Sequence, residues 1–212
     1  MDSDSGEGSY IKNSYNLGNL NHDGLNSYDC IGGLVGHGTI RIVENCYNKG
    51  SIISNSGYSY AGGIYGYSNY SDDTISNCTN YGKINVNSGR IAGIVGDSYY
   101  IKSIDNCFNY GNITLAKISS YGNHVGGITG NSFGGSITNC FNKADIIVDT
   151  SYYAGGIVGY IDGSGKVESC YNTGDVRCLK SGGYTYGGTG GVVRYSYGTK
   201  VRNVYNEGEV DG

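Results

Sequence analysis

An eleven-residue segment recurs seven times along this chain and constrains the fold more than any other feature. One copy reads Ile42-Val-Glu-Asn-Cys-Tyr-Asn-Lys-Gly-Ser-Ile52, and successive copies, aligned on the cysteine, are 32, 32, 29, 33, 30 and 34 residues apart. A period of this length is typical of a solenoid, in which each repeat is stabilised by contact with its neighbours. The cysteine position is filled by Ser14, Cys46, Cys78, Cys107, Cys140, Cys170 and Val204.

The positions around the cysteine also keep their residue types from copy to copy. An aliphatic residue stands three positions before it, glycine or Ala144 four positions after it, and a second aliphatic residue six positions after it. Residues two apart in a strand point to the same side, so the cysteine, the asparagine two positions later, the glycine and the second aliphatic residue should all point inward. The first aliphatic residue has the opposite parity, which requires a bend just before the cysteine. Asparagine tolerates left-handed backbone there, and the position holds Asn13, Asn45, Asn77, Asn106, Asn139, Ser169 and Asn203.

A glycine-rich segment precedes each of the six complete copies. Its first occurrence is Gly32-Gly-Leu-Val-Gly36, and its last, from Gly190 to Arg194, has lost the final glycine. We therefore expect one domain over residues 1–212, with a half repeat at residues 9–20. The expected repeat cores are 31–52, 60–84, 91–113, 125–146, 154–176 and 190–210.

Composition favours an all-β fold. The chain has 39 glycines and no proline, and its hydrophobic residues alternate at period two inside short segments. Glycine suits tight corners, whereas proline would remove a donor from a parallel ladder. These features predict a single-domain parallel β-helix, or β-solenoid, with about 30 residues per turn. We expect six full turns plus a half turn, three faces per turn and a right-handed coil.

The two segments together match a known repeat pattern. The strand Gly32-Gly33-Leu34-Val35-Gly36 has the signature of glycine, glycine, two aliphatic residues and glycine, and the Asn-Cys-Tyr-Asn-x-Gly-x-aliphatic segment is similar to its usual partner. The chain thus resembles the GLUG-motif repeats over nearly its whole length, departing from the motif at Arg194 and Val204. Such repeats occur in secreted or wall-attached bacterial proteins, including adhesins and non-catalytic regions of some immunoglobulin A peptidases. The resemblance implies a parallel β-helix at the bacterial cell surface or outside the cell, with no catalytic residues to carry over.

The cysteines are expected to pack rather than to react. Disulfides are one alternative, because equivalent α-carbons of neighbouring turns lie about 4.8 Å apart, but side chains in register point in parallel. Metal binding is another, but no Cys-x-x-Cys or Cys/His spacing is present, and His22, His37 and His124 share no position. A disulfide between Cys30 and Cys178, which lie outside the column, would have to bridge five turns. We favour a ladder of small buried thiols at Cys46, Cys78, Cys107, Cys140 and Cys170.

Asparagine two positions after the cysteine predicts a second structural ladder. Stacked amides can bond to one another and to the backbone of the turn, so this column should shape the fold rather than form a site. Its members are Asn16, Asn48, Asn80, Asn109, Asn142, Asn172 and Asn206.

Acidic residues stack only in the last three turns, at Asp145, Asp175 and Glu209. Neighbouring members would be about 5 Å apart, close to the separation in a retaining glycosidase and compatible with a shared cation. Outward positions of a rod are commonly charged for solubility, and that solvent role is the favoured interpretation. The three residues remain cation candidates, while no metal and no cofactor are expected.

Insertions gather at one corner of the repeat. They fall at Ser54 to Tyr60, Ala116 to Asn123, Asp149 to Tyr153 and Arg177 to Thr189. Insertions on one side of a repeat array often line its binding face, and flat aromatic rings suit sugars. The candidate partner-binding residues are Tyr58, Tyr60, Tyr121, Tyr152, Tyr153, Tyr184 and Tyr186.

Charge and hydropathy exclude two classes of partner. The net charge is −4 and the basic residues are scattered singly, so we expect no nucleic acid. No apolar run approaches 18 residues, so we expect no membrane insertion. The remaining partners are a host protein or glycan, and neighbouring repeats of a longer parent chain.

Four functions compete at this point. The first is a non-catalytic spacer or adhesion module, and the second is a glycan-binding module that uses the tyrosine corner. The third, a polysaccharide lyase or hydrolase using Asp145 and Asp175, is disfavoured, and we expect no enzyme. The fourth is end-to-end self-assembly through unpaired strand edges.

Overall fold

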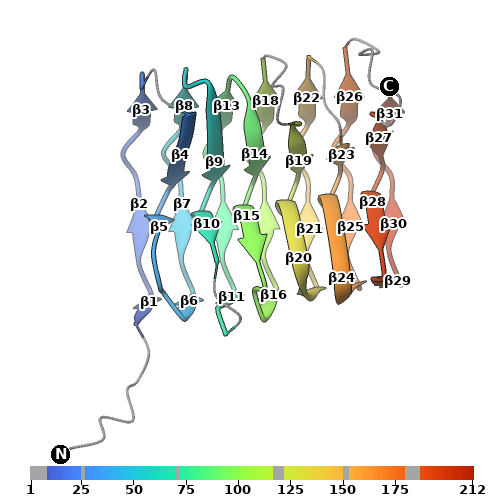
Figure 1. The fold of residues 1–212 in the computed structure, drawn as a ribbon, viewed down its shortest axis with the longest axis horizontal. Coiled ribbons are helices and arrows are strands. Elements are labelled where there is room, and N and C mark those ends of the chain that lie inside the picture. Colours follow the sequence, from blue (N-terminus) through green and yellow to red (C-terminus); the bar gives the residue numbers. More distant parts are fainter. Residues whose placement is uncertain (1–8, 25–26, 70–71, 117–121, 150–152, 180–186) are drawn as a thin grey trace, which may run out of the picture.

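The chain forms a solenoid of stacked parallel strands in a computed structural model that describes residues 9–24, 27–69, 72–116, 122–149, 153–179 and 187–212 (Figure 1). The described residues form strands and no helix, and so include no helix long and apolar enough to cross a bilayer. In Figure 1 each turn rises along the far face and descends along the near face while the chain advances from left to right. The coil is therefore right-handed, and the all-β solenoid expected from the sequence is confirmed.

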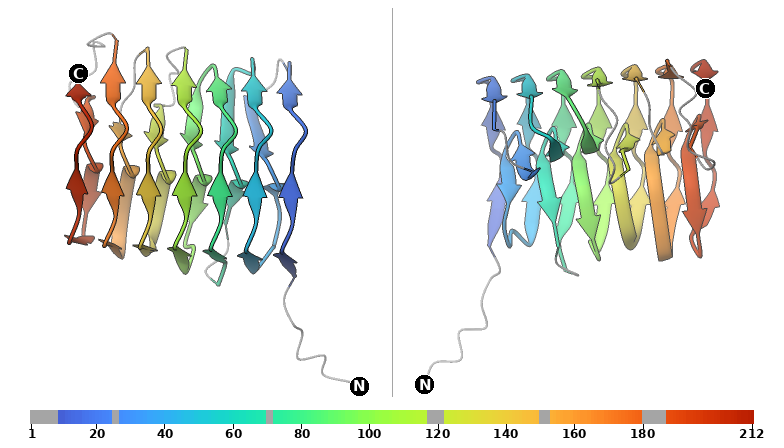
Figure 2. Two further views of the ribbon diagram at one scale, coloured as in Figure 1. Left: turned by 180° about the vertical axis from the view of Figure 1, so that it is seen from behind. Right: turned by 45° about the horizontal axis from the view of Figure 1, so that its top comes forward.

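The back face, which faces the reader in the left view of Figure 2, carries two seven-stranded sheets. The asparagine sheet contains β2 (Tyr15–Asn16), β7 (Tyr47–Asn48), β12 (Thr79–Asn80), β17 (Phe108–Asn109), β21 (Phe141–Asn142), β25 (Tyr171–Asn172) and β30 (Tyr205–Asn206). The isoleucine sheet contains β3 (Leu20–His22), β8 (Ile52–Ser54), β13 (Ile84–Val86), β18 (Ile113–Leu115), β22 (Ile146–Val148), β26 (Val176–Cys178) and β31 (Val210–Asp211).

The front face, which faces the reader in Figure 1, is built from the glycine sheet and part of an eleven-stranded long sheet. The glycine sheet contains β4 (Ser27–Gly32), β9 (Tyr58–Gly62), β14 (Gly89–Ala92), β19 (His124–Gly126), β23 (Tyr153–Gly155) and β27 (Thr189–Gly190). The front column of the long sheet contains β5 (Val35–His37), β10 (Tyr65–Ser68), β15 (Val95–Tyr99) and β28 (Val193–Tyr197).

The long sheet continues around the base of each turn. Its basal column contains β1 (Tyr10–Lys12), β6 (Ile42–Glu44), β11 (Thr74–Ser76), β16 (Ser103–Asp105) and β29 (Lys200–Arg202). Two longer strands, β20 (Thr129–Thr138) and β24 (Val158–Glu168), belong to both columns and join them into one sheet.

The bend before each cysteine forms as the sequence predicts. All seven residues at that position have φ between 51° and 55°, in the left-handed region. Asparagine occupies this region at low cost because its short polar side chain can bond locally, and serine replaces it once. The bend turns the chain from the basal column of the long sheet into the asparagine sheet.

The strands gather into four sheets, and the front face is divided between two of them. This division falls at the Gly-Gly pair, where β9 ends at Gly62 and β10 begins at Tyr65. The second residue of this pair is glycine in every turn, including Ala92-Gly93, and it lies against an asparagine of the back face. A β-carbon at Gly93 would overlap the side chain of Asn109. Only glycine permits the two faces to approach so closely.

This asparagine–glycine layer separates two hydrophobic cores. The lower core holds the cysteine column together with Val43, Ile64 and their equivalents. The upper core holds Ile52, Ala61 and their equivalents. Each turn thus buries two aliphatic clusters with a polar layer between them, and each turn depends on its neighbours for most of that burial.

Candidate functional site

The buried asparagines form an unbroken ladder that satisfies its own hydrogen bonds. Each side-chain Nδ2 donates to the Oδ1 of the next turn, at 2.7 to 2.9 Å from Asn16 to Asn206. The same Nδ2 also donates to the carbonyl oxygen two residues later. Because these amides are occupied by one another and by the backbone, the ladder stabilises the turns and presents little to a ligand.

The cysteine column is likewise turned inward. The five thiols are buried and not disulfide-bonded, and each Sγ lies 3.1 to 3.3 Å from the carbonyl oxygen two residues earlier. Cys30 and Cys178 are half-buried in β4 and β26, strands of different sheets at opposite ends of the solenoid. The column fills the lower core as small hydrophobic side chains do.

The acidic column is already engaged by protein groups. Asp145 Oδ1 accepts the backbone N–H of Asp175, and Asp175 Oδ1 accepts that of Glu209, at 3.1 and 2.9 Å. Arg177, two positions along the strand, lies 2.6 Å from Asp175 and 3.0 Å from Glu209. Within the described ranges no group of three His, Cys, Asp or Glu side chains is arranged to hold a metal ion. Arg177 lies outside the acidic column, so the column alone gave no sign of its positive partner.

Three of the seven candidate tyrosines lie among the described residues, and all three belong to strands of the glycine sheet. Tyr58 and Tyr60 lie in strand β9 rather than in a loop, and Tyr58 is buried, with its hydroxyl donating to the carbonyl of Gly122 at 3.1 Å. Tyr153 begins strand β23 on the front face. Tyr121, Tyr152, Tyr184 and Tyr186 lie outside the described residues.

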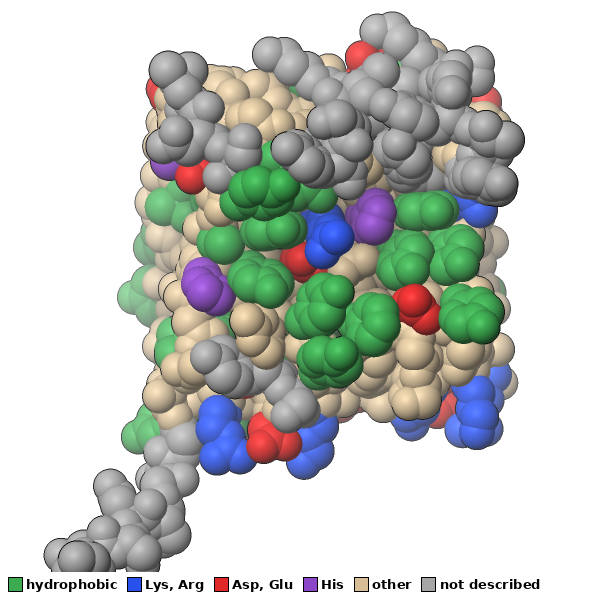
Figure 3. Space-filling model, viewed as in Figure 1, with side chains coloured by type: hydrophobic (Ala, Val, Ile, Leu, Met, Phe, Trp, Pro, Cys, Tyr) green, Lys and Arg blue, Asp and Glu red, His purple; other side chains and the backbone are tan. Residues whose placement is uncertain are grey.

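The structure instead gathers aromatic and polar side chains over the middle of the front face. Two outward columns lie side by side there, one from the glycine sheet and one from the long sheet. Figure 3 shows hydrophobic side chains collected on this face around a few charged and histidine side chains. We call this set the front patch: Tyr60, Arg90, His124 and Tyr153 in one column, and Tyr67, Asp97, Asn131, Tyr160 and Tyr195 in the other.

Four successive turns each contribute one lateral pair to the front patch, and Tyr195 extends one column into a fifth turn. The pairs change from aromatic to polar and back to aromatic along the solenoid axis. From the N-terminal side they are Tyr60 with Tyr67, stacked at 5.0 Å between ring centroids; Arg90 with Asp97, joined at 2.6 Å; His124 with Asn131, joined at 3.1 Å; and Tyr153 with Tyr160, at 5.3 Å between centroids.

Contacts between turns join these pairs into one network. The guanidinium of Arg90 lies 5.7 Å from the ring centroid of Tyr60, and Asn131 donates to Asp97 at 2.6 Å. The ring of Tyr160 stacks on His124 at 5.1 Å and on Tyr195 at 4.8 Å. Partly exposed rings beside fixed polar groups are usual components of a shallow recognition surface.

The ion pair at the centre of the front patch is largely removed from water. The side chain of Asp97 is 1% exposed and that of Arg90 is 24% exposed. Burial raises the pKa of Asp97, whereas Arg90 and Asn131 act against that rise. The carboxylate therefore depends on these two partners for its charge, and a buried pair of this kind holds its neighbours in place.

Acidification should weaken the fold through His124. Burial lowers the pKa of His124 to about 4, while the unfolded chain protonates near pH 6.5. The neutral ring is favoured in the folded state, so this contribution is complete above about pH 6.5 and is lost as pH falls towards 4. The loss is at most about 1.4 kcal/mol per pH unit. Thermal unfolding of the wild type and His124→Gln between about pH 7.5 and 4.5 measures it, and the variant should depend less on pH.

An unchanged pH dependence in His124→Gln would contradict the assignment.

A sequence signal for the front patch does exist. The members of each lateral pair are seven residues apart and flank a Gly-Gly pair, as Tyr60 and Tyr67 do around Gly62-Gly63, or, for Arg90 and Asp97, the equivalent Ala92-Gly93. Loop lengths vary only at the insertions and so gave no sign of this spacing. Arg90, Asp97, His124, Asn131 and Tyr160 were therefore absent from the predicted site.

Comparison with protein families matches the GLUG motif at residues 27–53, 121–147 and 150–177. Each match covers a glycine-sheet strand together with the cysteine-containing segment that follows it. Searches of curated proteins and of solved structures return no match.

Proposed function

Because this chain is a region of GLUG-motif repeats folded as a β-solenoid, we propose that it serves as a non-catalytic adhesion or spacer module of a bacterial cell-surface or secreted protein. The observation that carries this proposal is the asparagine ladder. Its hydrogen bonds run without interruption from the first turn to the last, so that the turns form one continuous rod. Such a rod holds a fixed distance and carries side chains on its faces in register.

The acidic column supports the non-catalytic assignment. Asp145 and Asp175 accept backbone hydrogen bonds, and Arg177 neutralises the second of them. A general acid and a nucleophile need carboxyl groups directed at a substrate, with separated pKa values. Incubation with uronan and neutral polysaccharides should release neither unsaturated products nor reducing ends. Activity abolished by Asp175→Asn would overturn this part of the proposal.

Adhesion through glycans is the second candidate function, and the front patch favours it. Tyr67 and Tyr160 are partly exposed in one column, and Arg90 and Asn131 lie between them in the network. The faces of both rings are covered by neighbouring rings, so their edges and hydroxyls are the parts that can contact a sugar. The partly exposed guanidinium of Arg90 can bind sugar hydroxyls beside them. Arg90 and Asp97 neutralise one another, so the patch suits uncharged glycans.

Removing the rings should abolish this recognition. The variants Tyr67→Ala and Tyr160→Ala should each weaken retention of a bound glycan about tenfold or more, the loss expected of about 1.4 kcal/mol. A glycan array, with light scattering to exclude aggregation, measures the retention. Tyr205→Ala, an exposed tyrosine of the back face, is the matched control and should bind normally. A blank array for a monodisperse wild type would leave the spacer role alone.

A further inference from the structure

The back face carries a ladder of outward rings on the asparagine sheet. The position after the cysteine is aromatic in six of seven turns, and the residues pair in register. Tyr15 stacks on Tyr47 at 5.0 Å between ring centroids, and Tyr171 stacks on Tyr205 at 4.9 Å. The column consists of Tyr15, Tyr47, Thr79, Phe108, Phe141, Tyr171 and Tyr205.

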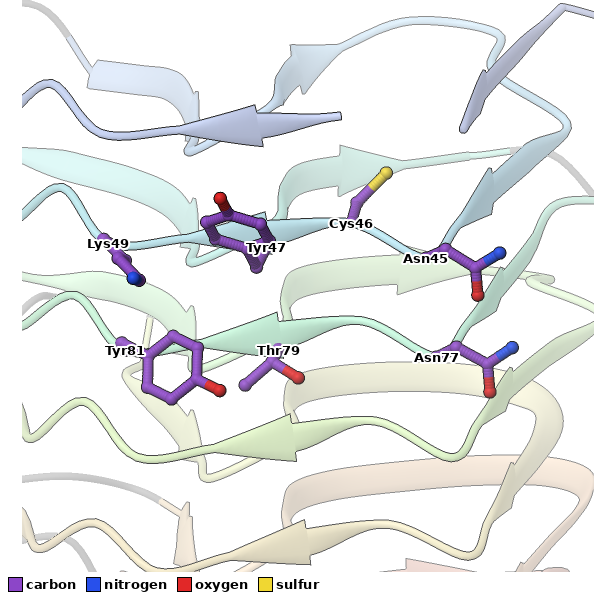
Figure 4. Close-up of a pocket in the computed structure, with 7 residues that line it drawn as sticks. All are labelled: Asn45, Cys46, Tyr47, Lys49, Asn77, Thr79 and Tyr81. Atoms are coloured by element: carbon purple, nitrogen blue, oxygen red, sulfur yellow. The ribbon is translucent and has the colours of Figure 1, made fainter. Parts of the chain in front are cut away.

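Thr79 interrupts this ladder. It pairs with Tyr47 on one side and with Phe108 on the other, so that the strands bearing these two rings are two spacings, or about 10 Å, apart. A groove of about 450 Å³ opens at this point (Figure 4). It is lined by Asn45, Cys46, Tyr47, Lys49, Asn77, Thr79 and Tyr81. Its volume lies within the range of small-molecule sites, and one ring-sized group fits where the missing ring would be.

The groove carries one positive charge and no negative one. Lys49 Nζ lies 5.5 Å from the ring centroid of Tyr47 and 6.0 Å from that of Tyr81, between the two rings. Lys49 forms no ion pair with a carboxylate of the described chain, in contrast to Lys12 and Lys166. An unpaired ammonium group held between aromatic rings favours an anionic ligand.

Two amides complete the polar side of the groove. Asn45 and Asn77 are exposed bend residues, and Figure 4 shows their side chains at the end of the groove away from Lys49. The Oδ1 of Asn77 accepts a hydrogen bond from Asn106 at 2.6 Å, so the Nδ2 of Asn77 points away from Asn106. The groove therefore offers amide groups at one end, ring faces along its length and an ammonium group at the other end.

We propose that this groove binds a carboxylate-bearing pyranose, such as a uronic acid residue of a polysaccharide. The sugar ring occupies the gap above Thr79 and packs on Tyr47 and Tyr81. Its carboxylate pairs with Lys49, and its hydroxyls bond to the amides of Asn45 and Asn77. The site lies on the face opposite the front patch and takes a charged ligand, so it goes beyond the proposed function and does not depend on it.

Titration of the whole chain with trigalacturonate, followed by NMR, tests the proposal. Wild type should bind this probe and bind the neutral galactose trisaccharide about tenfold more weakly. Lys49→Gln should weaken the binding of trigalacturonate about tenfold. Raising the salt concentration should reduce the difference in affinity between this variant and the wild type. Thr79→Tyr should abolish binding, because the added ring completes the ladder and fills the gap.

Lys143→Gln is the matched control. Lys143 stands at the same position of its repeat as Lys49. It lies near Phe141, a member of the aromatic ladder that pairs with Phe108, so no ring is missing from the ladder there. This variant should bind as the wild type does, and so should Tyr67→Ala on the front face. Equal affinity of Thr79→Tyr and wild type, or no detectable binding by a folded wild type, would overturn the proposal.

Discussion

Replacing Asn109 by alanine should destabilise the solenoid by about 4 kcal/mol, or about 1 kcal/mol for each of four lost hydrogen bonds. Asn109 is fully buried in the middle of the ladder. It accepts from Asn80 at 2.9 Å and donates to Asn142 at 2.8 Å, and its amide also bonds to both backbone groups of Gly111. Water cannot replace these partners inside the rod, so alanine leaves them unsatisfied. Urea unfolding followed by circular dichroism measures the loss.

Asn16→Ala provides the comparison for Asn109→Ala. Asn16 has the same position in its repeat but lies in the first turn, where it is only partly buried and bonds to one neighbouring amide. Water can reach the groups that this substitution exposes, so the loss should be about 1 kcal/mol. Equal losses at the two positions would show that the ladder does not stabilise the interior in the way inferred above.

Asp97→Asn should cost about 3 kcal/mol, the second large effect. The substitution keeps the shape of the side chain but leaves the guanidinium of Arg90 without its partner at 2.6 Å. Removing one member of a largely buried ion pair is destabilising because the remaining charge, here the 24% exposed Arg90 side chain, is only partly solvated and is no longer paired. Thermal and urea unfolding at neutral pH measure the change.

Two further variants separate this explanation from a general loss of packing. Asp175→Asn breaks an ion pair with Arg177, whose side chain is 42% exposed, and should cost less than about 1 kcal/mol. The double variant Arg90→Met/Asp97→Leu removes both charges and should recover much of the stability lost by Asp97→Asn. A double variant as unstable as the single one would contradict the role given to the unpaired arginine.

Much of the fold could be predicted from single columns of the repeat. The asparagine before each cysteine predicted a left-handed bend, and all seven such residues have positive φ. The period predicted the solenoid and the right number of turns, because each turn contacts only its neighbours. The division of the front face at Gly62-Gly63 could not be predicted in this way, since it depends on the contact between those glycines and asparagines of the opposite face.

The candidate surfaces were less predictable than the fold. Loop lengths predicted a binding site at a set of tyrosines. Of these, Tyr58 is buried and Tyr60 lies in a strand. The acidic column was visible in the sequence, but its neutralisation by Arg177 depends on how side chains of neighbouring turns reach one another. The types of the residues do not predict which columns of outward side chains lie beside each other.

The sequence by itself determined the period, the inward columns and the bends, because these depend on strand parity and on the backbone preferences of asparagine and glycine. Only the tertiary structure decided which outward residues meet. Arg90 reaches Asp97 because the bend after Ala92-Gly93 sets two strands of one turn end to end on a single face. The groove at Thr79 exists because parallel register stacks Tyr47 and Phe108 on either side of a residue without a ring.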